Sequence, residues 1–288
     1  MNSSLQSLLT LMEFIRDISC QEDAWKMVPE ATVLMAFMSI VRCHRSPNEQ
    51  NKLDALFTFK MEVAERFPEF SDMGQKDAHE FLTSFLEHIE RLNPVMTELS
   101  NKTEKVYKCP VQVHLSFKMQ NTRTCRRCGH SSRTEEMFNN LSLNLVPQES
   151  VQDMLENYLL ETDTQQYSFK TLPRVLILHV KRFCYTLSMT LKKLHNKVNI
   201  SRELLVSSTQ ANGWYSLVSF ISHLGCNANS GHYVSAGVQR EAVEDDVTDS
   251  WAMYDDNYVT NVAGTSVCSQ VPDQANGSPP PAPPAPQR

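Results

Sequence analysis

Two short stretches of sequence decide the fold, Asn229-Ser230-Gly231-His232-Tyr233-Val234 and Trp251-Ala252-Met253-Tyr254-Asp255-Asp256. Each joins a turn to a run of apolar and aromatic residues that is typical of a β-strand. When two such strands pair in antiparallel fashion, the start of one lies beside the end of the other. We therefore expect His232 and Asp255 to be neighbours, with Gly231 letting the backbone bend tightly before the histidine.

A histidine with a carboxylate behind it is part of the machinery of a cysteine hydrolase. Such enzymes need a base that holds the nucleophile as a thiolate and a third group that orients the base. His232 and the acidic corner at Asp255 and Asp256 supply the last two members of a triad of this kind. A structural histidine followed by an Asp-Asp-Asn turn is the plainer interpretation, and these residues alone leave both open.

The segment Gly74-Gln75-Lys76-Asp77-Ala78-His79-Glu80-Phe81 begins the clearest amphipathic helix of the chain. Asp77 stands where it can cap that helix, and Glu80 follows three residues later, as in a capping box. Two carboxylates at a helix start can also bind a cationic, extended peptide. The two interpretations are compatible, and both stay open here.

The segment Cys125-Arg126-Arg127-Cys128-Gly129-His130 has the form of one knuckle of a zinc ribbon. A structural zinc site needs four ligands, so a matching second knuckle should follow, and none does. The spacing of the other candidate ligands gives no support, and these are Cys109, His114, His130 and Cys184. We predict that Cys125 and Cys128 are half of an incomplete zinc site, and that the chain binds no zinc and no other cofactor.

The periodicity of apolar residues changes along the chain. Helical spacing occurs in four early segments, which are residues 5–15, Thr32–Val41, Leu53–Phe67 and Asp77–Leu92. Strand-like runs follow from Val106 onward, and they are His114–Met119, Leu141–Leu145, Val175–Val180, Trp214–Leu224, Tyr233–Val238 and Trp251–Tyr254. A helical lobe followed by an antiparallel β lobe predicts an α+β fold with a cleft between the lobes.

The 288 residues have the composition of a soluble globular protein, 41% hydrophobic and 21% charged. A formal net charge of -6 disfavours nucleic acid as the main partner. No stretch is long enough to span a membrane, no secretory leader is recognisable, and eight cysteines are too few for a disulfide scaffold. We expect an intracellular protein of the cytosol or nucleus, with a disordered tail rich in proline and alanine at residues 272–288.

Several segments, in order along the chain, together resemble the ubiquitin-specific protease family, also called ubiquitin carboxyl-terminal hydrolases. Residues 75–81 resemble its Gln-Gln-Asp-Ala-His-Glu-Phe segment, with Lys76 in place of the second glutamine. Residues 172–183 resemble its Leu-Pro-x-Val-Leu-Ile-Leu-His-Leu-Lys-Arg-Phe strand. Residues 230–234 resemble its histidine box, and residues 254–256 the segment that carries its third catalytic member. Within the family, the sequence is similar to the branch around ubiquitin carboxyl-terminal hydrolase 37.

The resemblance implies a papain-like cysteine protease fold with a helical thumb, a β palm and shortened β fingers. The catalytic domain is then expected at residues 1–271, with the thumb at about 1–105 and the fingers and palm at about 106–265. The implied partners are ubiquitin and ubiquitinated proteins, without nucleic acid or a membrane.

The resemblance also implies roles for individual residues. His232 corresponds to the general base and Asp255 to its orienting partner, with Asp256 as a candidate assistant. The residues that correspond to positions binding the arginine-bearing tail of ubiquitin are Asp77, Glu80 and Tyr233. Those that correspond to the first zinc knuckle at the fingertips are Cys125 and Cys128.

Two departures from the family pattern bear on activity. Met1-Asn2-Ser3 matches the motif Asn-Thr-Cys-Tyr-Met-Asn-Ser only from its methionine onward, so the nucleophilic cysteine is expected two residues before Met1. Cys20 cannot replace it, because a continuous helix would place it roughly 25–30 Å from the helix start. The segment 162–170 lacks the second zinc knuckle of the family, which predicts short, metal-free fingers.

These observations leave three hypotheses. The first is a deubiquitinase domain that hydrolyses ubiquitin isopeptide bonds in the intact family member, whereas the chain as written is truncated and inactive. The second is a catalytically inactive pseudoprotease that binds ubiquitin without cutting it. The third is an unrelated α+β interaction protein. The order of the matching motifs argues against this third hypothesis.

Overall fold

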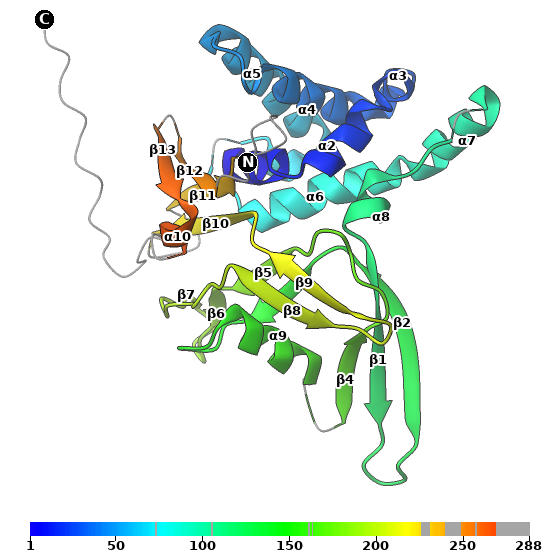
Figure 1. Cartoon of the computed structure of the whole chain (residues 1–288), viewed down its shortest axis with the longest axis vertical. Coiled ribbons are helices and arrows are strands. Elements are labelled where there is room, and N and C mark those ends of the chain that lie inside the picture. Colours follow the sequence, from blue (N-terminus) through cyan, green and yellow to red (C-terminus); the bar gives the residue numbers. More distant parts are fainter. Residues whose placement is uncertain are drawn as a thin grey trace, which may run out of the picture.

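The computed structural model describes residues 1–72, 74–104, 106–160, 162, 164–225, 231–239, 249–256 and 258–268. The predicted tail at residues 272–288, together with Asn229 and Ser230 of the histidine segment, lies outside this part of the chain. Helices occupy the N-terminal part of the molecule and strands most of the remainder (Figure 1). The predicted α+β class is therefore confirmed.

The helices are α1 (Asn2–Leu9), α2 (Met12–Ser19), α3 (Glu22–Trp25), α4 (Thr32–Cys43), α5 (Glu49–Arg66), α6 (Ala78–Arg91), α7 (Asn93–Thr103), α8 (Pro110–His114), α9 (Val151–Leu160) and α10 (Gly264–Val267). The strands are β1 (Phe117–Thr124), β2 (Ser131–Phe138), β3 (Leu141–Asn144), β4 (Gln165–Phe169), β5 (Leu178–Lys181), β6 (Phe183–Tyr185), β7 (Leu191–Lys193), β8 (Glu203–Ser207), β9 (Asn212–Ser216), β10 (Ser219–Leu224), β11 (His232–Val238), β12 (Ser250–Asp255) and β13 (Tyr258–Ala263). Within the described residues, no helix combines the length and apolar composition that crossing a bilayer requires.

The helical lobe, α1 to α7, is built around buried aromatic rings. Phe37 of α4, Phe59 of α5, and Phe81 and Phe85 of α6 are almost fully buried. Their ring centroids lie 5.2 to 6.4 Å apart, mostly in edge-to-face contacts, which aromatic quadrupoles favour. The predicted helices at Thr32–Val41, Leu53–Phe67 and Asp77–Leu92 correspond to α4, α5 and α6.

The predicted helix over residues 5–15 is divided into two. Helix α1 ends at Leu9, and the chain bends at Thr10 and Leu11 before α2 begins. The Thr10 hydroxyl donates a hydrogen bond to the Ser7 carbonyl (2.7 Å), a local bond of the kind that bends helices. The apolar side chains of both helices still face the same core, in which Leu5 and Leu8 are buried.

The β lobe, from β1 onward, contains two larger sheets. The sheet β2-β1-β4 extends away from the helices as a long projection, and the sheet β10-β11-β12-β13 packs beside α1 (Figure 1). Strands within both sheets pair in antiparallel fashion. Smaller pairs are β6–β7, β8–β9 and β3–β5, and the last is parallel. The predicted antiparallel lobe is therefore wrong for this one pair.

Three predicted strands have different boundaries. His114 ends the short helix α8, which begins at a proline, and the strand β1 starts only at Phe117. Val175 precedes β5 and donates its backbone N–H to the His114 carbonyl (2.9 Å), so it joins α8 and not a strand ladder. The segment Trp214–Leu224 is interrupted at Leu217, whose N–H bonds the Arg202 carbonyl (2.7 Å), and forms β9 and β10.

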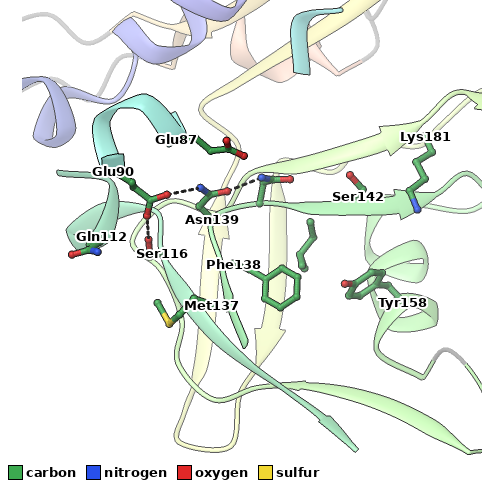
Figure 2. Close-up of a pocket in the computed structure, with 12 residues that line it drawn as sticks. Glu87, Glu90, Gln112, Ser116, Met137, Phe138, Asn139, Ser142, Tyr158 and Lys181 are labelled. Carbon is green, nitrogen blue, oxygen red and sulfur yellow. Dashed lines mark hydrogen bonds between the residues drawn. The ribbon is translucent and has the colours of Figure 1, made fainter. Parts of the chain in front are cut away.

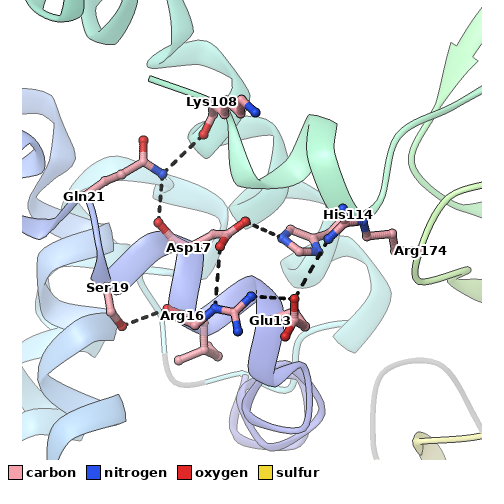
Figure 3. A network of polar contacts seen from close by, with 9 residues as sticks. Glu13, Arg16, Asp17, Ser19, Gln21, Lys108, His114 and Arg174 are labelled. Carbon is pink, nitrogen blue, oxygen red and sulfur yellow. Dashed lines mark hydrogen bonds and ion pairs between the residues drawn. The ribbon is translucent and has the colours of Figure 1, made fainter. Parts of the chain in front are cut away.

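A polar network fastens α2 to the beginning of the β lobe (Figure 3). His114 is buried, with its Nε2 at 2.8 Å from Oδ2 of Asp17 and its ring edge-on to Phe14. Arg174, which precedes β5, lies 3.9 Å from the carboxylate of Glu13. The first residues of the chain are thereby held against a segment far away in the sequence.

The burial of His88 makes the stability of the fold sensitive to acid. It lies on α6 with 1% of its surface exposed, and burial together with Arg66 lowers the pKa of His88 to about 4. An unfolded histidine titrates near 6.5, so the unfolded chain binds this proton more readily, and stability is lost as the pH falls from about 6.5 towards 4. We expect His88→Leu to reduce that loss by about 2 kcal/mol.

Urea denaturation of both chains at several pH values between 7 and 4 checks the His88 prediction. The measured quantity is the difference in unfolding free energy between neutral and acidic pH, so a constant cost of the substitution cancels. Identical pH dependence in the two chains would contradict the prediction.

Candidate active site

Strands β11 and β12 bring His232 and Asp255 together. Their antiparallel register, which pairs Ser235 with Tyr254, places the start of β11 beside the end of β12. The His232 Nε2 lies 2.5 Å from Oδ1 of Asp255. The two side chains are 37% and 52% exposed, so the imidazole is oriented by a carboxylate and remains accessible from outside.

Asp256 lies on the other side of the same imidazole. It occupies the left-handed region (φ 49°) after β12, and its Oδ2 is 3.9 Å from Nδ1 of His232. Because Asp255 bonds Nε2, Nδ1 is the nitrogen that can take a proton from a thiol. Ligand atoms of the three residues lie within 4.8 Å of one another, as expected for one imidazole with a carboxylate near each of its nitrogens.

Gly231 shapes the entrance to β11. It has φ of 156°, and a Cβ at this position would collide with the Leu224 carbonyl and the His223 ring. His223 is held in turn by Lys193, whose Nζ lies 2.9 Å from Nδ1 of His223 and donates to the carbonyls of His223 and Gly225, both at 2.8 Å. Lys193 is 2% exposed, so a buried ammonium group fixes the end of β10, the strand that pairs with the start of β11.

Sequence reasoning missed the Lys193–His223 pair. Burial, reinforced by the Lys193 charge, lowers the pKa of His223 to about 4, so the ring is neutral around neutral pH and its Nδ1 can accept from the ammonium group. The His223 ring also packs on Tyr233, with centroids 4.7 Å apart. No alternating pattern marks Lys193 as buried, because Leu191 and Lys192 before it on β7 are both exposed.

The first turn of α1 contacts β11. The Ser3 hydroxyl donates to the Tyr233 carbonyl (3.1 Å), and the Ser4 hydroxyl donates to the Ala78 carbonyl (2.9 Å). Both serines are buried. The start of α1 is thereby held beside the residue that follows His232, and the N-terminus of a helix is where a thiolate is stabilised.

Asp77 caps α6 and also bonds across to the β lobe. Its Oδ1 accepts from the backbone N–H groups of His79 (2.8 Å) and Glu80 (2.9 Å), and its Oδ2 accepts from the Tyr233 hydroxyl (3.1 Å). Burial and the Asp77 charge raise the pKa of Tyr233, which keeps the hydroxyl protonated as a donor. Both carboxylate oxygens of Asp77 therefore have partners within the chain.

Glu80 differs from Asp77 in this respect. It is exposed, and among the described residues its carboxylate forms no hydrogen bond or ion pair. The return bond of a capping box to the Asp77 N–H is absent there, so that part of the sequence prediction is wrong. Because Asp77 alone satisfies the helix start, the Glu80 carboxylate is available to an outside cation.

No cysteine of the described chain hydrogen-bonds His232. Cys20 follows α2 and is exposed, Cys109 is buried before α8, and Cys268 follows α10. Cys226 lies outside the described residues. The site as described therefore has the base and its carboxylate but no thiol beside them.

The Cys125–Cys128 turn joins β1 to β2 at the far end of the projecting sheet. It is closed by Cys125 N–H to the His130 carbonyl (2.8 Å) and by Gly129 N–H to the Cys125 carbonyl (2.9 Å), with Gly129 at φ 70°. Backbone N–H groups of Cys128 and Arg127 lower the pKa of the Cys125 thiol. Both thiols are exposed.

The described residues around this turn do not fit a zinc ion. The facing chain, before β4, presents the Thr164 carbonyl, which accepts from Thr124 N–H (2.7 Å), and hydroxyl groups of Thr162 and Thr164 that bond each other. Two thiolates leave two of the four positions of a structural zinc site without a nitrogen or sulfur ligand. In the part of the chain that is described, three metal-ligating side chains converge only at His232, Asp255 and Asp256.

A pocket of about 530 Å³ lies between α6, α8 and the base of the projecting sheet (Figure 2). Glu90 accepts from the Asn139 amide (3.3 Å) and the Ser116 hydroxyl (3.4 Å), and burial raises the pKa of its carboxyl group. Glu87 of the same helix also lines the pocket. This acidic, hydrogen-bonding surface extends along α6 away from the helix start at Asp77.

The family model described as "Ubiquitin carboxyl-terminal hydrolase" matches residues 1–276. The chain belongs to this family. Ubiquitin carboxyl-terminal hydrolase 37 of Mus musculus and of Homo sapiens are each 32% identical over 241 residues, which cover 72% of the chain and 25% of the relative. The chain thus spans about a quarter of the length of these curated relatives. The predicted family, and the branch around hydrolase 37 within it, are confirmed.

Solved structures of the ubiquitin carboxyl-terminal hydrolase family share the fold. The SAGA Ubp8/Sgf11/Sus1/Sgf73 DUB module bound to ubiquitin aldehyde matches with a TM-score of 0.76 at 20% identity, over 93% of this chain and 64% of that chain. The same module bound to monoubiquitin matches with a TM-score of 0.75 at 21% identity, over the same shares. The predicted papain-like arrangement of this family is confirmed as the fold.

Proposed function

We propose that this domain carries the active site of a thiol-dependent hydrolase of ubiquitin isopeptide bonds, with His232 as general base and Asp255 as its orienting partner. The observation that supports it best is the 2.5 Å contact between Nε2 of His232 and Oδ1 of Asp255, formed next to the start of α1. An exposed imidazole with one nitrogen held by a carboxylate can cycle a proton on the other nitrogen.

The reaction that this geometry supports has two stages. A thiolate at a helix N-terminus attacks the carbonyl carbon of the ubiquitin terminal glycine, and the imidazolium returns its proton to the departing lysine amine. Water then attacks the thioester with the imidazole as base and restores the thiol. His232 moves the proton in both stages, while Asp255 keeps the ring in one tautomer.

A polypeptide of these 288 residues is proposed to bind ubiquitin without hydrolysing it. In the family motif, the nucleophile precedes the methionine that aligns with Met1, and the described cysteines lie elsewhere in the fold. The hydrogen bonds that join α6 to β11 and to α1 are nevertheless formed. The alternative function, a ubiquitin-binding pseudoprotease, rests on the positions of the described cysteines and on these contacts between α6, β11 and α1.

The cationic tail of ubiquitin is proposed to bind along the start of α6. Glu80 supplies the free carboxylate, whereas Asp77 and Tyr233 form the hydrogen-bonded wall behind it. An arginine of the tail can form a charge-assisted pair with the Glu80 carboxylate. This assigns direct recognition to Glu80 and support to the other two residues.

Reversing the charge of Glu80 tests this arrangement. We expect Glu80→Arg to weaken ubiquitin binding by about 10-fold or more, because attraction becomes repulsion at the tail site. Isothermal titration of the purified chain with ubiquitin measures the change. Glu65→Arg on α5 is the matched control, since Glu65 is also an exposed helical glutamate and its reversal makes the same change in net charge.

The two variants separate the outcomes. Equal affinities for both variants would reject the role of Glu80 while leaving ubiquitin binding intact. The absence of any binding by the folded wild-type chain would reject ubiquitin as the partner.

A further inference from the structure

The turn between β1 and β2 holds two thiols that the proposed reaction does not use. Cys125 and Cys128 are both exposed, and they belong to one turn that backbone hydrogen bonds close, from Cys125 N–H to the His130 carbonyl and from Gly129 N–H to the Cys125 carbonyl. The turn lies at the far end of the sheet β2-β1-β4, away from β11 and α1 (Figure 1). The two thiols are therefore close together in the chain at a place remote from His232.

Among the described neighbours of this turn, only His130 could add one more nitrogen or sulfur ligand for a metal, and its ring does not converge with the two thiols. The pocket beside it, of about 310 Å³, is lined by arginine, threonine, serine and glutamine side chains, together with His130 and Cys125. Thr164 faces Thr124 across the strands where a second pair of cysteines would be needed. Since zinc binds tightly only where nitrogen or sulfur ligands fill its tetrahedron, the thiols are left without that partner.

The backbone geometry suits a bond between the two sulfurs. Gly129 N–H bonds the Cys125 carbonyl, so Cys125 and Cys128 are the first and fourth residues of a closed turn. A turn closed from residue i to residue i+4 is a single helical turn, in which helix geometry puts the first and fourth Cα atoms roughly 5 Å apart, and disulfides span Cα distances of about 4.4–6.8 Å. A disulfide can therefore form without opening the β1–β2 hairpin.

We propose that Cys125 and Cys128 are a reversible redox pair, which a peroxide converts into an intrachain disulfide. The Cys125 thiolate attacks one peroxide oxygen, forming a sulfenic acid and releasing the other oxygen as water. The Cys128 thiol then attacks the sulfenic sulfur, forming the S–S bond and releasing a second water. The two thiols lose two electrons and two protons, and the peroxide gains both.

Reduction reverses the step through a small thiol such as glutathione. One glutathione thiolate attacks the disulfide and forms a mixed disulfide, and a second releases the protein thiol and leaves as oxidised glutathione. The closed loop is very short, so the gain in stability is small. The proposal concerns the redox state of the projecting sheet's tip, and it does not depend on the proposed hydrolase function.

Alkylation and mass spectrometry test the pair directly. The purified chain is treated with hydrogen peroxide, denatured in N-ethylmaleimide and cut after glutamates, because trypsin would cut at Arg126 and Arg127 between the two cysteines. Fragment ions distinguish the pair from Cys109, which lies in the same peptide. Cys20 and Cys184 are internal controls, since both are exposed single thiols.

We expect Cys125 and Cys128 to become resistant to alkylation together, and the mass of the peptide to fall by two hydrogens. The two thiols should be oxidised at least about 10-fold faster than the control thiols. Added glutathione should restore both. In Cys128→Ser, the peptide should show no intrachain disulfide, and a sulfenic-acid probe should label Cys125 instead.

Three results would overturn the redox pair. One is oxidation of Cys125 and Cys128 no faster than that of Cys20 and Cys184. Another is loss of the two thiols independently of each other. The third is stoichiometric zinc binding by the reduced chain, measured against a chromophoric chelator and abolished in Cys125→Ser, because it would show a complete metal site.

Discussion

A chain extended before Met1 by Asn-Thr-Cys-Tyr is expected to cleave a ubiquitin substrate at least about 10³-fold faster than the 288-residue polypeptide, since loss of a triad nucleophile costs several orders of magnitude. The extension completes the family motif around the methionine that aligns with Met1. Its cysteine would enter next to the first turn of α1, where Ser3 already bonds the Tyr233 carbonyl. His232 immediately precedes Tyr233 on β11, so the proposed base is in place before the thiol arrives.

A fluorogenic ubiquitin derivative provides the measurement, with three controls. The extension with alanine in place of its cysteine should be inactive, as should the extended chain carrying His232→Ala. Cys226→Ser in the unextended chain removes the cysteine nearest to His232 in the sequence and should change nothing. Two results would contradict this prediction. One is that the unextended chain cleaves the substrate faster than its own His232→Ala variant. The other is that the extended chain binds ubiquitin and remains inactive.

Replacement of Lys193 is expected to give the largest loss of stability among the substitutions considered. Lys193→Met keeps the length of the side chain but leaves the carbonyls of His223 and Gly225 and one ring nitrogen without their donor. Each buried acceptor without a partner costs about 1–3 kcal/mol. We therefore expect the free energy of unfolding to fall by about 3 kcal/mol or more.

Lys192→Met is the matched control for Lys193, because Lys192 precedes it on β7 and is exposed. Chemical denaturation of the two variants should show an effect below about 0.5 kcal/mol for Lys192. NMR titration of His223 adds an independent readout. Burial is the larger cause of the low pKa of His223 and the Lys193 charge is the smaller one, so removing the ammonium group should raise that pKa. Equal stabilities for the two variants would remove Lys193 from this role.

The His232–Asp255 pair and the Asp77 cap were both predictable because each follows from local rules. Antiparallel pairing of two strands fixes which ends meet, and an aspartate before an amphipathic helix accepts from the first free N–H groups. The helices α4, α5 and α6 likewise follow from strong apolar periodicity. These features need only short stretches of sequence.

Other features could not be predicted because their cause lies elsewhere in the chain. Lys193 is buried only because the end of β10, distant in sequence, presents carbonyl oxygens to it. Helix α8 forms within a segment whose apolar pattern favours a strand, and His114 in it is held by Asp17 of α2. Strand β2 is exposed over almost its whole length, so it has no alternating burial to predict it from.

The position of Tyr233 has a consequence for how the proposed active site could be regulated. Its carbonyl is bonded by α1 through Ser3 and its hydroxyl by α6 through Asp77, while its backbone continues directly from the imidazole-bearing residue. A rigid-body shift of the helices would therefore strain or break these two hydrogen bonds to β11. An effector that tilts the helical lobe is expected to shift the His232 ring through the neighbouring Tyr233.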